Sequence, residues 1–253
     1  MSESIIENQS KIKKLVVPIV VGALTLIAVI SAGIWIRSQL SSQDGVKTVD
    51  NLVRDFNPVI GKKDSRVKFV YLYDYMCPAC QSNADNMVKL KQEYSDKIAF
   101  VYKPFIVHPG SGDRMTYASY AALKQGKFDD FNSKLIKQTP DYPTAGLSVS
   151  QLENLAKQTG LDSIAFTKDY NSIEIEKQVK IDQKDIRDTV ITPSRYTKET
   201  KVSATPTIVL LKDNKLTDHW WSGVISLEDG KDREGKDQKG VKSRINDLLA
   251  ETK

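Results

Sequence analysis

The 253-residue sequence predicts an α/β fold that contains an inserted helical subdomain and is preceded by one transmembrane helix. Three observations lead to this prediction: a long uncharged apolar run near the N-terminus, a strand–helix–strand pattern after it, and a middle region with helical spacing only. Hydrophobic residues make up 40% of the chain, which is enough for one core of ordinary size, or at most two. Intrinsic disorder and collagen-like repetition are excluded.

The charge balance argues against nucleic acid as a partner. The chain has 37 Lys and Arg against 32 Asp and Glu, and the two kinds of charge are interspersed. Proteins that bind nucleic acid usually gather basic residues on one face or along one stripe. We therefore expect no nucleic-acid partner.

The apolar run from Leu15 to Ile36 predicts a transmembrane helix that contacts membrane lipid. As a helix it would reach about 33 Å, enough to cross the hydrocarbon core of a bilayer. It would separate a cytoplasmic tail, residues 1–14, from a polar tether, residues 37–56. More lysines precede the run than follow it closely, so the positive-inside rule places the N-terminus in the cytoplasm. The folded domain would then lie outside the cytoplasm, where disulfides persist.

A cleaved signal peptide is the alternative for this run, and it would make the folded domain a secreted protein. The run is longer than the apolar core of an ordinary signal peptide. In addition, Ser31-Ala32-Gly33 is a poor substitute for an Ala-x-Ala cleavage site. We therefore expect an uncleaved, single-pass anchor in the cell membrane.

The folded domain is predicted to open with a strand, a helix and a second strand. Residues 67–75 and 98–102 are rich in β-branched and aromatic side chains, and both runs are too short for typical helices. Between them, apolar residues recur at spacings of three and four from Cys80, which indicates one face of a single helix. These residues are Ala84, Met87, Leu90 and Tyr94. The order is that of a right-handed βαβ unit.

The middle of the domain has helical patterns, which predict an insertion over about residues 111–190. The helices are expected at 114–125, 128–137, 150–159 and 163–188. Strand patterns return at 207–211 and 216–221, and the turn-forming residues between them predict a hairpin. We expect a final helix at 243–252 and a solvated loop in the charged segment 228–239.

The chain has two cysteines, Cys77 and Cys80, so any disulfide within it must join this pair. They follow the first strand directly, and Pro78 favours a helix start at this point. A thiol in the first turn of a helix faces unpaired backbone N–H groups and the positive end of the helix dipole, which lower its pKa. We therefore expect Cys77 to be the attacking thiol and Cys80, one turn further along, to be the resolving thiol.

Other uses of the two cysteines are less consistent with the sequence. A zinc site needs about four ligands, and the other soft candidates, His108 and His219, lie far apart. A Cys-His hydrolase would need His108 as its base, but a lone His before Pro and Gly is typical of an exposed loop. Inert buried thiols would not require a strand-to-helix junction with a proline between them. Redox chemistry is therefore favoured, with no metal, flavin or nucleotide cofactor.

Several motifs, in chain order, resemble the DsbA-like branch of the thioredoxin superfamily. They are Asn57-Pro58-Val59-Ile60-Gly61, Tyr73 to Cys80, Tyr102-Lys103-Pro104-Phe105, Tyr117 to Phe131, and Val202 to Thr207. The resemblance runs from Asn57 to about Trp221. It implies a thioredoxin fold with a helical insertion over residues 57–253, and an active site that performs thiol–disulfide exchange.

The resemblance also implies roles for residues near the cysteines. Thr205-Pro206 would be a cis peptide bond, in a loop that packs against the cysteines and offers backbone hydrogen bonds to an extended substrate. Asp74 lies where this branch often has an acidic residue, and a carboxylate there can accept the proton of the resolving thiol. A helix cap or a solvated strand end is the alternative for Asp74.

The dipeptide Pro78-Ala79 between the cysteines tunes how strongly the attacking thiolate is stabilised. Many members of the branch place an aromatic residue or His before the second Cys, where this chain has Ala79. This departure indicates a less strongly oxidising protein than those members.

The resemblance implies a thiol:disulfide oxidoreductase that introduces disulfides into cysteine-containing exported proteins and is reset by a membrane redox partner. A reductase or isomerase of the same fold is one alternative. A non-catalytic, chaperone-like binding module is another. The substitution Cys77→Ser separates the last alternative from the redox functions, because only a redox function depends on this thiol.

Overall fold

The main sheet of the computed structural model has five strands in the order β1-β3-β2-β6-β7. The structure describes residues 52–139, 145–191, 200–231 and 235–251. The five strands are β1 (Val59–Gly61), β2 (Val67–Tyr73), β3 (Ala99–Pro104), β6 (Thr207–Lys212) and β7 (Lys215–Ser222). β2 and β3 run parallel, and the other neighbouring pairs are antiparallel. The predicted α/β class and the predicted βαβ unit are confirmed, with β2 and β3 as its strands; β1, which was not predicted, precedes the unit.

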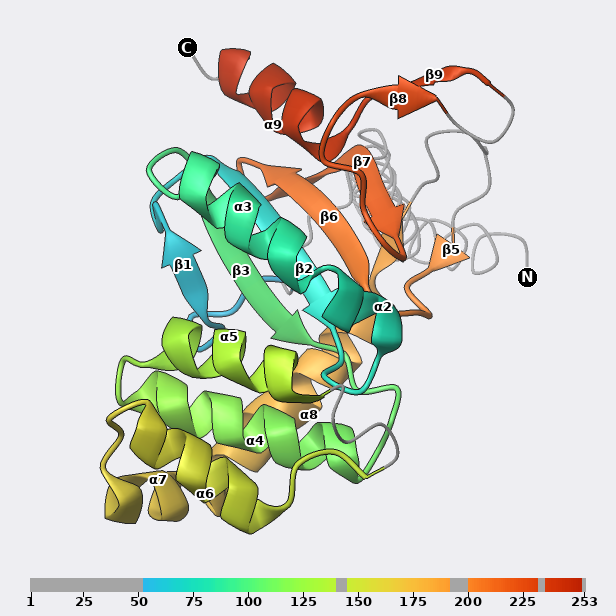
Figure 1. Ribbon diagram of the computed structural model, residues 1–253. Helices are drawn as coiled ribbons and strands as arrows, with labels where there is room; N and C mark the ends of the chain where they lie inside the picture. The colour runs from blue at the N-terminus through green and yellow to red at the C-terminus, as the bar shows by residue number, and fades with distance from the viewer. Residues whose placement is uncertain (1–51, 140–144, 192–199, 232–234, 252–253) are drawn as a thin grey trace, which may run out of the picture. The chain divides into compact units, whose positions relative to one another are not determined.

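The two faces of β2 contribute to two separate apolar clusters, because successive side chains of a strand point to opposite faces. Phe69, Tyr71 and Tyr73 pack into the larger cluster with residues of α3 (Ala84–Tyr94) and α9 (Val241–Ala250). Val70 and Leu72 pack into the smaller cluster on the other face. Burial of β2 on both faces explains its continuous apolar sequence. Figure 1 shows α3 lying across the front of the sheet.

The single helix predicted after the cysteines is two helices in the structure. α2 (Pro78–Ser82) carries the cysteines at its start, and α3 follows after a break at Asn83. The apolar spacing from Cys80 to Tyr94 continues across the break, which is why periodicity alone indicated one helix. The strand predicted over residues 67–75 is also shorter in the structure, where β2 ends at Tyr73.

The helical insertion lies between β3 and the later strands, and Figure 1 shows its helices packed together beyond one end of the sheet. It consists of α4 (Ser111–Lys124), α5 (Phe128–Gln138), α6 (Val149–Gln158), α7 (Ser163–Tyr170) and α8 (Ile173–Asp188). The prediction of one helix over 163–188 is wrong. Ser172 accepts a hydrogen bond from the Ile175 N–H and so begins a new helix.

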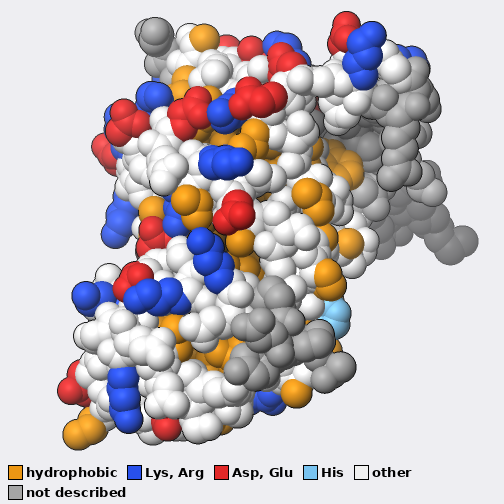
Figure 2. All heavy atoms as spheres, in the orientation of Figure 1, with side chains coloured by type: hydrophobic (Ala, Val, Ile, Leu, Met, Phe, Trp, Pro, Cys, Tyr) orange, Lys and Arg blue, Asp and Glu red, His pale blue; other side chains and the backbone are white. Residues whose placement is uncertain are grey.

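The predicted hairpin of β6 and β7 is confirmed. Its turn residues Asp213 and Asn214 have φ angles of 52° and 59°, which suit a two-residue hairpin turn. The segment predicted as a loop instead contains two short strands, β8 (Gly230–Lys231) and β9 (Asp237–Gln238), which are exposed. A further pair joins β4 (Val190–Ile191) to β5 (Thr200–Lys201). In Figure 2, acidic and basic side chains are mixed over the visible face.

The folded domain begins before residue 57, although residues 37–56 were assigned to the tether. Leu52 is fully buried in the smaller apolar cluster. Arg54 donates two hydrogen bonds of 2.9 Å to the carboxylate of Asp185 on α8. The predicted transmembrane run, 15–36, lies outside the described residues. Among the helices that the structure does describe, none has the length and apolar character needed to cross a membrane.

Candidate active site

The two cysteines lie where β2 passes into α2. Cys77 is the N-cap of α2, with an extended backbone, and Pro78 occupies the first helical position. The Cys77 N–H donates to the Asp74 carbonyl at 3.1 Å, which forms the turn between strand and helix. Both cysteines are free thiols. Cys77 is 7% exposed to solvent, and Cys80 is fully buried. An outer and an inner thiol are therefore one helical turn apart.

The surroundings of Cys77 lower the pKa of its thiol to about 5. The largest cause is a hydrogen bond from the Cys80 thiol, and burial opposes it. The Thr205 side chain and the backbone N–H groups of Cys80 and Ala79 also stabilise the thiolate. At neutral pH Cys77 is therefore a thiolate.

The pKa of Cys80 moves in the opposite direction. Burial raises it most, and the neighbouring negative sulfur of Cys77 raises it further. Cys80 is therefore a neutral thiol at neutral pH and serves as the hydrogen-bond donor to Cys77.

The loop before β6 packs against the outer thiol. The Thr205–Pro206 peptide bond is cis, as the resemblance implies. The Cys77 Sγ lies 3.2 Å from the Thr205 carbonyl oxygen, to which it donates a hydrogen bond when it is protonated. The Thr205 hydroxyl is buried and has no hydrogen-bond partner among the described residues, but it lies close enough to both sulfurs to lower the pKa of each. It can therefore turn toward a thiolate when one forms.

Asp74 is buried at the end of β2, and its carboxylate holds two segments together. One oxygen accepts from the Met76 N–H at 2.9 Å. The other accepts from the N–H groups of Val107 and His108, both at 2.8 Å, and lies 3.0 Å from His108 Nδ1. None of the hydrogen bonds described for this carboxylate reaches a thiol. Because Asp74 is buried, it is not a solvated strand end, and its described backbone partners lie in the turn before α2 and in the loop at residues 107–108.

The remaining sequence candidates lie apart from the sulfur chemistry or at its edge. Between the cysteines, Pro78 is exposed and Ala79 is half-buried. His108 is half-exposed in the loop before α4, and His219 lies on β7, where it contacts Asp218. In the described ranges, His, Cys, Asp and Glu form no group of three or more suited to a metal ion.

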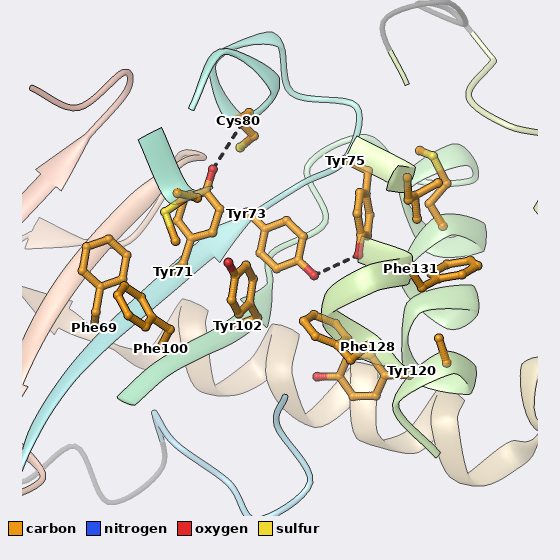
Figure 3. Packing of buried hydrophobic residues seen from close by; sticks show 14 of the residues in the cluster. Phe69, Tyr71, Tyr73, Tyr75, Cys80, Phe100, Tyr102, Tyr120, Phe128 and Phe131 are labelled. Carbon is orange, nitrogen blue, oxygen red and sulfur yellow. Dashed lines mark hydrogen bonds between the residues drawn. The ribbon is translucent and has the colours of Figure 1, made fainter. Parts of the chain in front are cut away.

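The sequence reasoning missed a cluster of tyrosines beneath Cys80. The Tyr71 hydroxyl donates to the Cys80 carbonyl at 3.4 Å, and the hydroxyls of Tyr73 and Tyr75 lie 3.1 Å apart (Figure 3). Burial raises the pKa of Tyr71 and Tyr73 well above the ordinary value, so both remain neutral donors. The aromatic residues of β2 were interpreted as core only. The two-residue spacing of Tyr71, Tyr73 and Tyr75 was the one sequence signal that they share a face of the strand, beneath α2.

Comparison with known proteins agrees with this geometry. A family model described as thioredoxin matches residues 55–223, which include both cysteines and the cis-proline loop. The chain belongs to the thioredoxin family. Disulfide bond formation protein D of Bacillus subtilis (strain 168) is 34% identical to the chain over 108 residues, which are 40% of this chain and 48% of that protein. A probable disulfide bond formation protein D of Bacillus cereus is 31% identical over 134 residues, 49% of this chain and 60% of that protein.

Solved structures of other proteins share the fold of this chain. BdbD from Bacillus subtilis, in its oxidised form, has a TM-score of 0.57 and 22% identity, covering 77% of this chain and 94% of that one. The thiol-disulfide exchange protein alpha-DsbA2 from Wolbachia pipientis has a TM-score of 0.58 and 16% identity, covering 81% and 91%. The sequence alignments span about half of the curated relatives' length.

Proposed function

We propose that this protein is a thiol:disulfide oxidoreductase that introduces disulfides into other proteins. The observation that carries the proposal is the pair of opposed thiols, with the pKa of the outer Cys77 lowered to about 5 and that of the inner Cys80 raised. A lowered pKa stabilises the reduced protein, and a protein whose reduced form is stable gives its disulfide away readily.

The reaction begins with a disulfide between Cys77 and Cys80. A substrate thiolate attacks the Cys77 sulfur, Cys80 leaves, and the buried Cys80 takes up a proton. A second substrate thiolate then attacks the substrate sulfur of the mixed disulfide, and Cys77 leaves as a thiolate. The substrate loses two electrons and gains a disulfide, while the protein gains two electrons.

The raised pKa of Cys80 favours this forward direction. Back attack by Cys80 on the mixed disulfide would release the substrate unoxidised. Because Cys80 holds its proton at neutral pH, this back attack is slow. The second substrate cysteine thus has time to react, and Cys77 is a good leaving group because its thiolate is stable.

We expect a reduction potential between those of strongly oxidising and reducing members of the fold. The pKa of Cys77, about 5, lies between values of about 3.5 and about 7 for such members. The corresponding potentials are about −120 mV and about −270 mV. Equilibration of the protein with glutathione, followed by counting free thiols, measures this quantity. A value near about −270 mV would make the protein a reductase, and unchanged function in Cys77→Ser would make it a binding module.

The substrates in this proposal are cysteine-containing exported proteins, and a membrane redox partner resets the cysteine pair after each cycle. The name of the Bacillus relatives, disulfide bond formation protein D, supports this assignment. In the variant Cys80→Ala, the Cys77 thiolate should attack the disulfide of the redox partner or of an already oxidised substrate, and the resulting mixed disulfide should persist because Cys80 is absent and cannot resolve it. Recovery of cytoplasmic proteins alone would contradict the proposal.

The anchor at residues 15–36 and the extracytoplasmic location of the domain belong to the same proposal. The uncharged run and the lysines before it support them. The full chain should then remain in the membrane fraction after a salt wash, and protease added outside intact cells stripped of their wall should digest the domain. Recovery of a shortened, freely released chain would indicate a cleaved signal peptide.

A further inference from the structure

Asn83 lies at the break between α2 and α3, where it ends one helix and begins the next. Its N–H donates to the carbonyls of Ala79 and Cys80, at 3.2 Å each, and its carbonyl accepts from the Met87 N–H at 2.9 Å. An Asn at a helix start usually uses its side chain to accept a backbone N–H of the first turn. Asn83 makes no such cap. Its side chain, which is fully buried, serves another contact.

The Asn83 side chain binds a segment that is 140 residues further along the chain. Nδ2 donates to the Gly223 carbonyl, and Oδ1 accepts from the Ile225 N–H, both at 3.1 Å. Asn86, at the start of α3, donates to the Ile225 carbonyl at 3.1 Å. Three backbone groups of residues 223–225 are therefore held by the helices that follow the cysteines.

The same segment holds the cis-proline loop. The Gly223 N–H donates to the Pro206 carbonyl at 2.9 Å. The carbonyl oxygen of Thr205, one residue earlier, lies 3.2 Å from the Cys77 sulfur. A path of contacts thus runs from Cys77 through the loop to residues 223–225, then by hydrogen bonds to Asn83, and returns along α2. Groups in such a path fix one another's positions.

We propose that Asn83 is a positioning residue, which keeps the cis-proline loop aligned with Cys77 so that an extended peptide can react there. The inference rests on the proposed exchange activity. Without the Asn83 amide, the end of α2 would lose its two hydrogen bonds to residues 223–225, the segment that holds the cis-proline loop. A peptide that binds along the loop needs that alignment, whereas glutathione is small enough to reach Cys77 without it.

The test compares two substrates on the full-length, oxidised protein. One is a short peptide with a single cysteine, and the other is glutathione; second-order rate constants are measured for the wild type, Asn83→Ala and Ser82→Ala. Asn83→Ala should lower the ratio of the peptide rate constant to the glutathione rate constant about tenfold, which is the size expected for losing buried hydrogen bonds. Ser82→Ala, the control, removes only a hydroxyl bond of 3.0 Å to the Pro78 carbonyl and should leave the ratio unchanged.

The outcomes separate this inference from the proposed function. If the wild type reacts with neither substrate, the proposed function fails. If the wild type and Asn83→Ala react with equal ratios, the positioning role fails and the function stands. Thermal unfolding of each variant is measured in parallel, because a purely structural role would lower the Tm without changing the ratio.

A second variant keeps the test decisive if Asn83→Ala does not fold. Asn83→Asp retains the side-chain shape and the acceptor for the Ile225 N–H, but it places an oxygen against the Gly223 carbonyl in place of the donor. The same fall in the ratio is expected, and an unchanged ratio would overturn the positioning role.

Discussion

Cys77 and Cys80 are three residues apart, and their environments move their pKa values in opposite directions. The outer sulfur receives a hydrogen bond from the inner thiol, while backbone N–H groups at the start of α2 add to its stabilisation. The inner sulfur is desolvated and receives no comparable support. One proton therefore stays on Cys80 and the negative charge stays on Cys77, which is the distribution that exchange chemistry requires.

Alkylation of the reduced protein should follow the Cys77 thiolate. The rate with iodoacetamide is expected to rise with pH around a midpoint of about 5 and to level off below neutral pH. Cys80→Ala removes the largest stabilising contact, so the midpoint should move to higher pH. A midpoint that Cys80→Ala does not change would show that the helix start alone lowers the pKa.

The same thiolate makes the stability of the reduced protein depend on pH. The pKa of Cys77 is lower in the folded chain than its ordinary value of 9.0, so its contribution is complete above about 9 and disappears as the pH falls to about 5. Cys80 remains protonated in the folded chain over this range, and in the unfolded chain it begins to ionise only as the pH approaches its ordinary pKa of 9.0. The Tm of the reduced protein minus that of the oxidised protein should therefore decrease from pH 9 to pH 5. A difference that is constant over this range would contradict the assignment of the thiolate.

Asp74 is expected to matter for stability and not for proton transfer. In Asp74→Asn, an N–H₂ group faces N–H donors that the carboxylate accepts in the native protein, and we expect a loss of about 2 kcal/mol in the free energy of unfolding. The pH midpoint of Cys77 alkylation should stay near 5, because Asp74 is not among the groups that shift this pKa. Urea unfolding measures the first quantity. Slow release of mixed disulfides in an otherwise stable Asp74→Asn would instead support a proton acceptor.

The helical insertion is attached to the sheet by a buried group of charges. Lys103 on β3 is fully buried and contacts the carboxylates of Asp182 and Asp185 on α8. Asn57 donates to both Asp182 oxygens at 3.0 Å, and the Tyr120 hydroxyl of α4 donates to one of them. Burial raises the pKa of Asp182, and the Lys103 ammonium opposes that shift most strongly. β3, α4 and α8 therefore each contribute a buried polar group whose hydrogen-bond or ion-pair partner lies on another element.

Removal of the buried cation should be costly. Lys103→Met would leave the buried Asp182 carboxylate without its counter-charge and Asp185 with Arg54 alone, and we expect a loss of about 3–5 kcal/mol in the free energy of unfolding. Lys134→Met provides the control, since Lys134 pairs with Asp130 on the exposed face of α5 and such pairs contribute roughly 0–1 kcal/mol. Equal losses in the two variants by urea unfolding would show that burial of the cluster is unimportant.

The fold was predictable from the sequence wherever one local signal decided it. Continuous apolar character indicated β2, and turn residues indicated the hairpin of β6 and β7. The breaks at Asn83 and Ser172 were not predictable, because the apolar spacing continues across both, and at Asn83 the side chain binds Gly223 and Ile225, far away in the sequence. The cysteines were identified directly. The hydrogen bonds of Asp74 were not, since alternation along a strand does not reveal which loop packs against its end.

The domain as a whole extends further toward the N-terminus than the apolar patterns indicated. Leu52 stands with Val49, Val53 and Phe56 in a short segment that was assigned to the tether, yet Leu52 is fully buried. Leu52→Ala in the full chain should therefore lower the free energy of unfolding by about 2–5 kcal/mol, the range for buried leucines. Ile164→Ala is the control, because Ile164 is 83% exposed and its loss should have little effect. A neutral Leu52→Ala would place the start of the domain near residue 57 after all.

The separation of α2 from α3 also has a consequence for motion. A helix of five residues that ends at its own cap can open without disturbing Leu90 and Tyr94, which remain packed on the sheet from α3. The amide protons of α2 should then exchange with solvent deuterium earlier than those of α3. Such local opening would expose the inner sulfur briefly while the rest of the domain stays folded, and it would give buried Cys80 a route to exchange its proton with water.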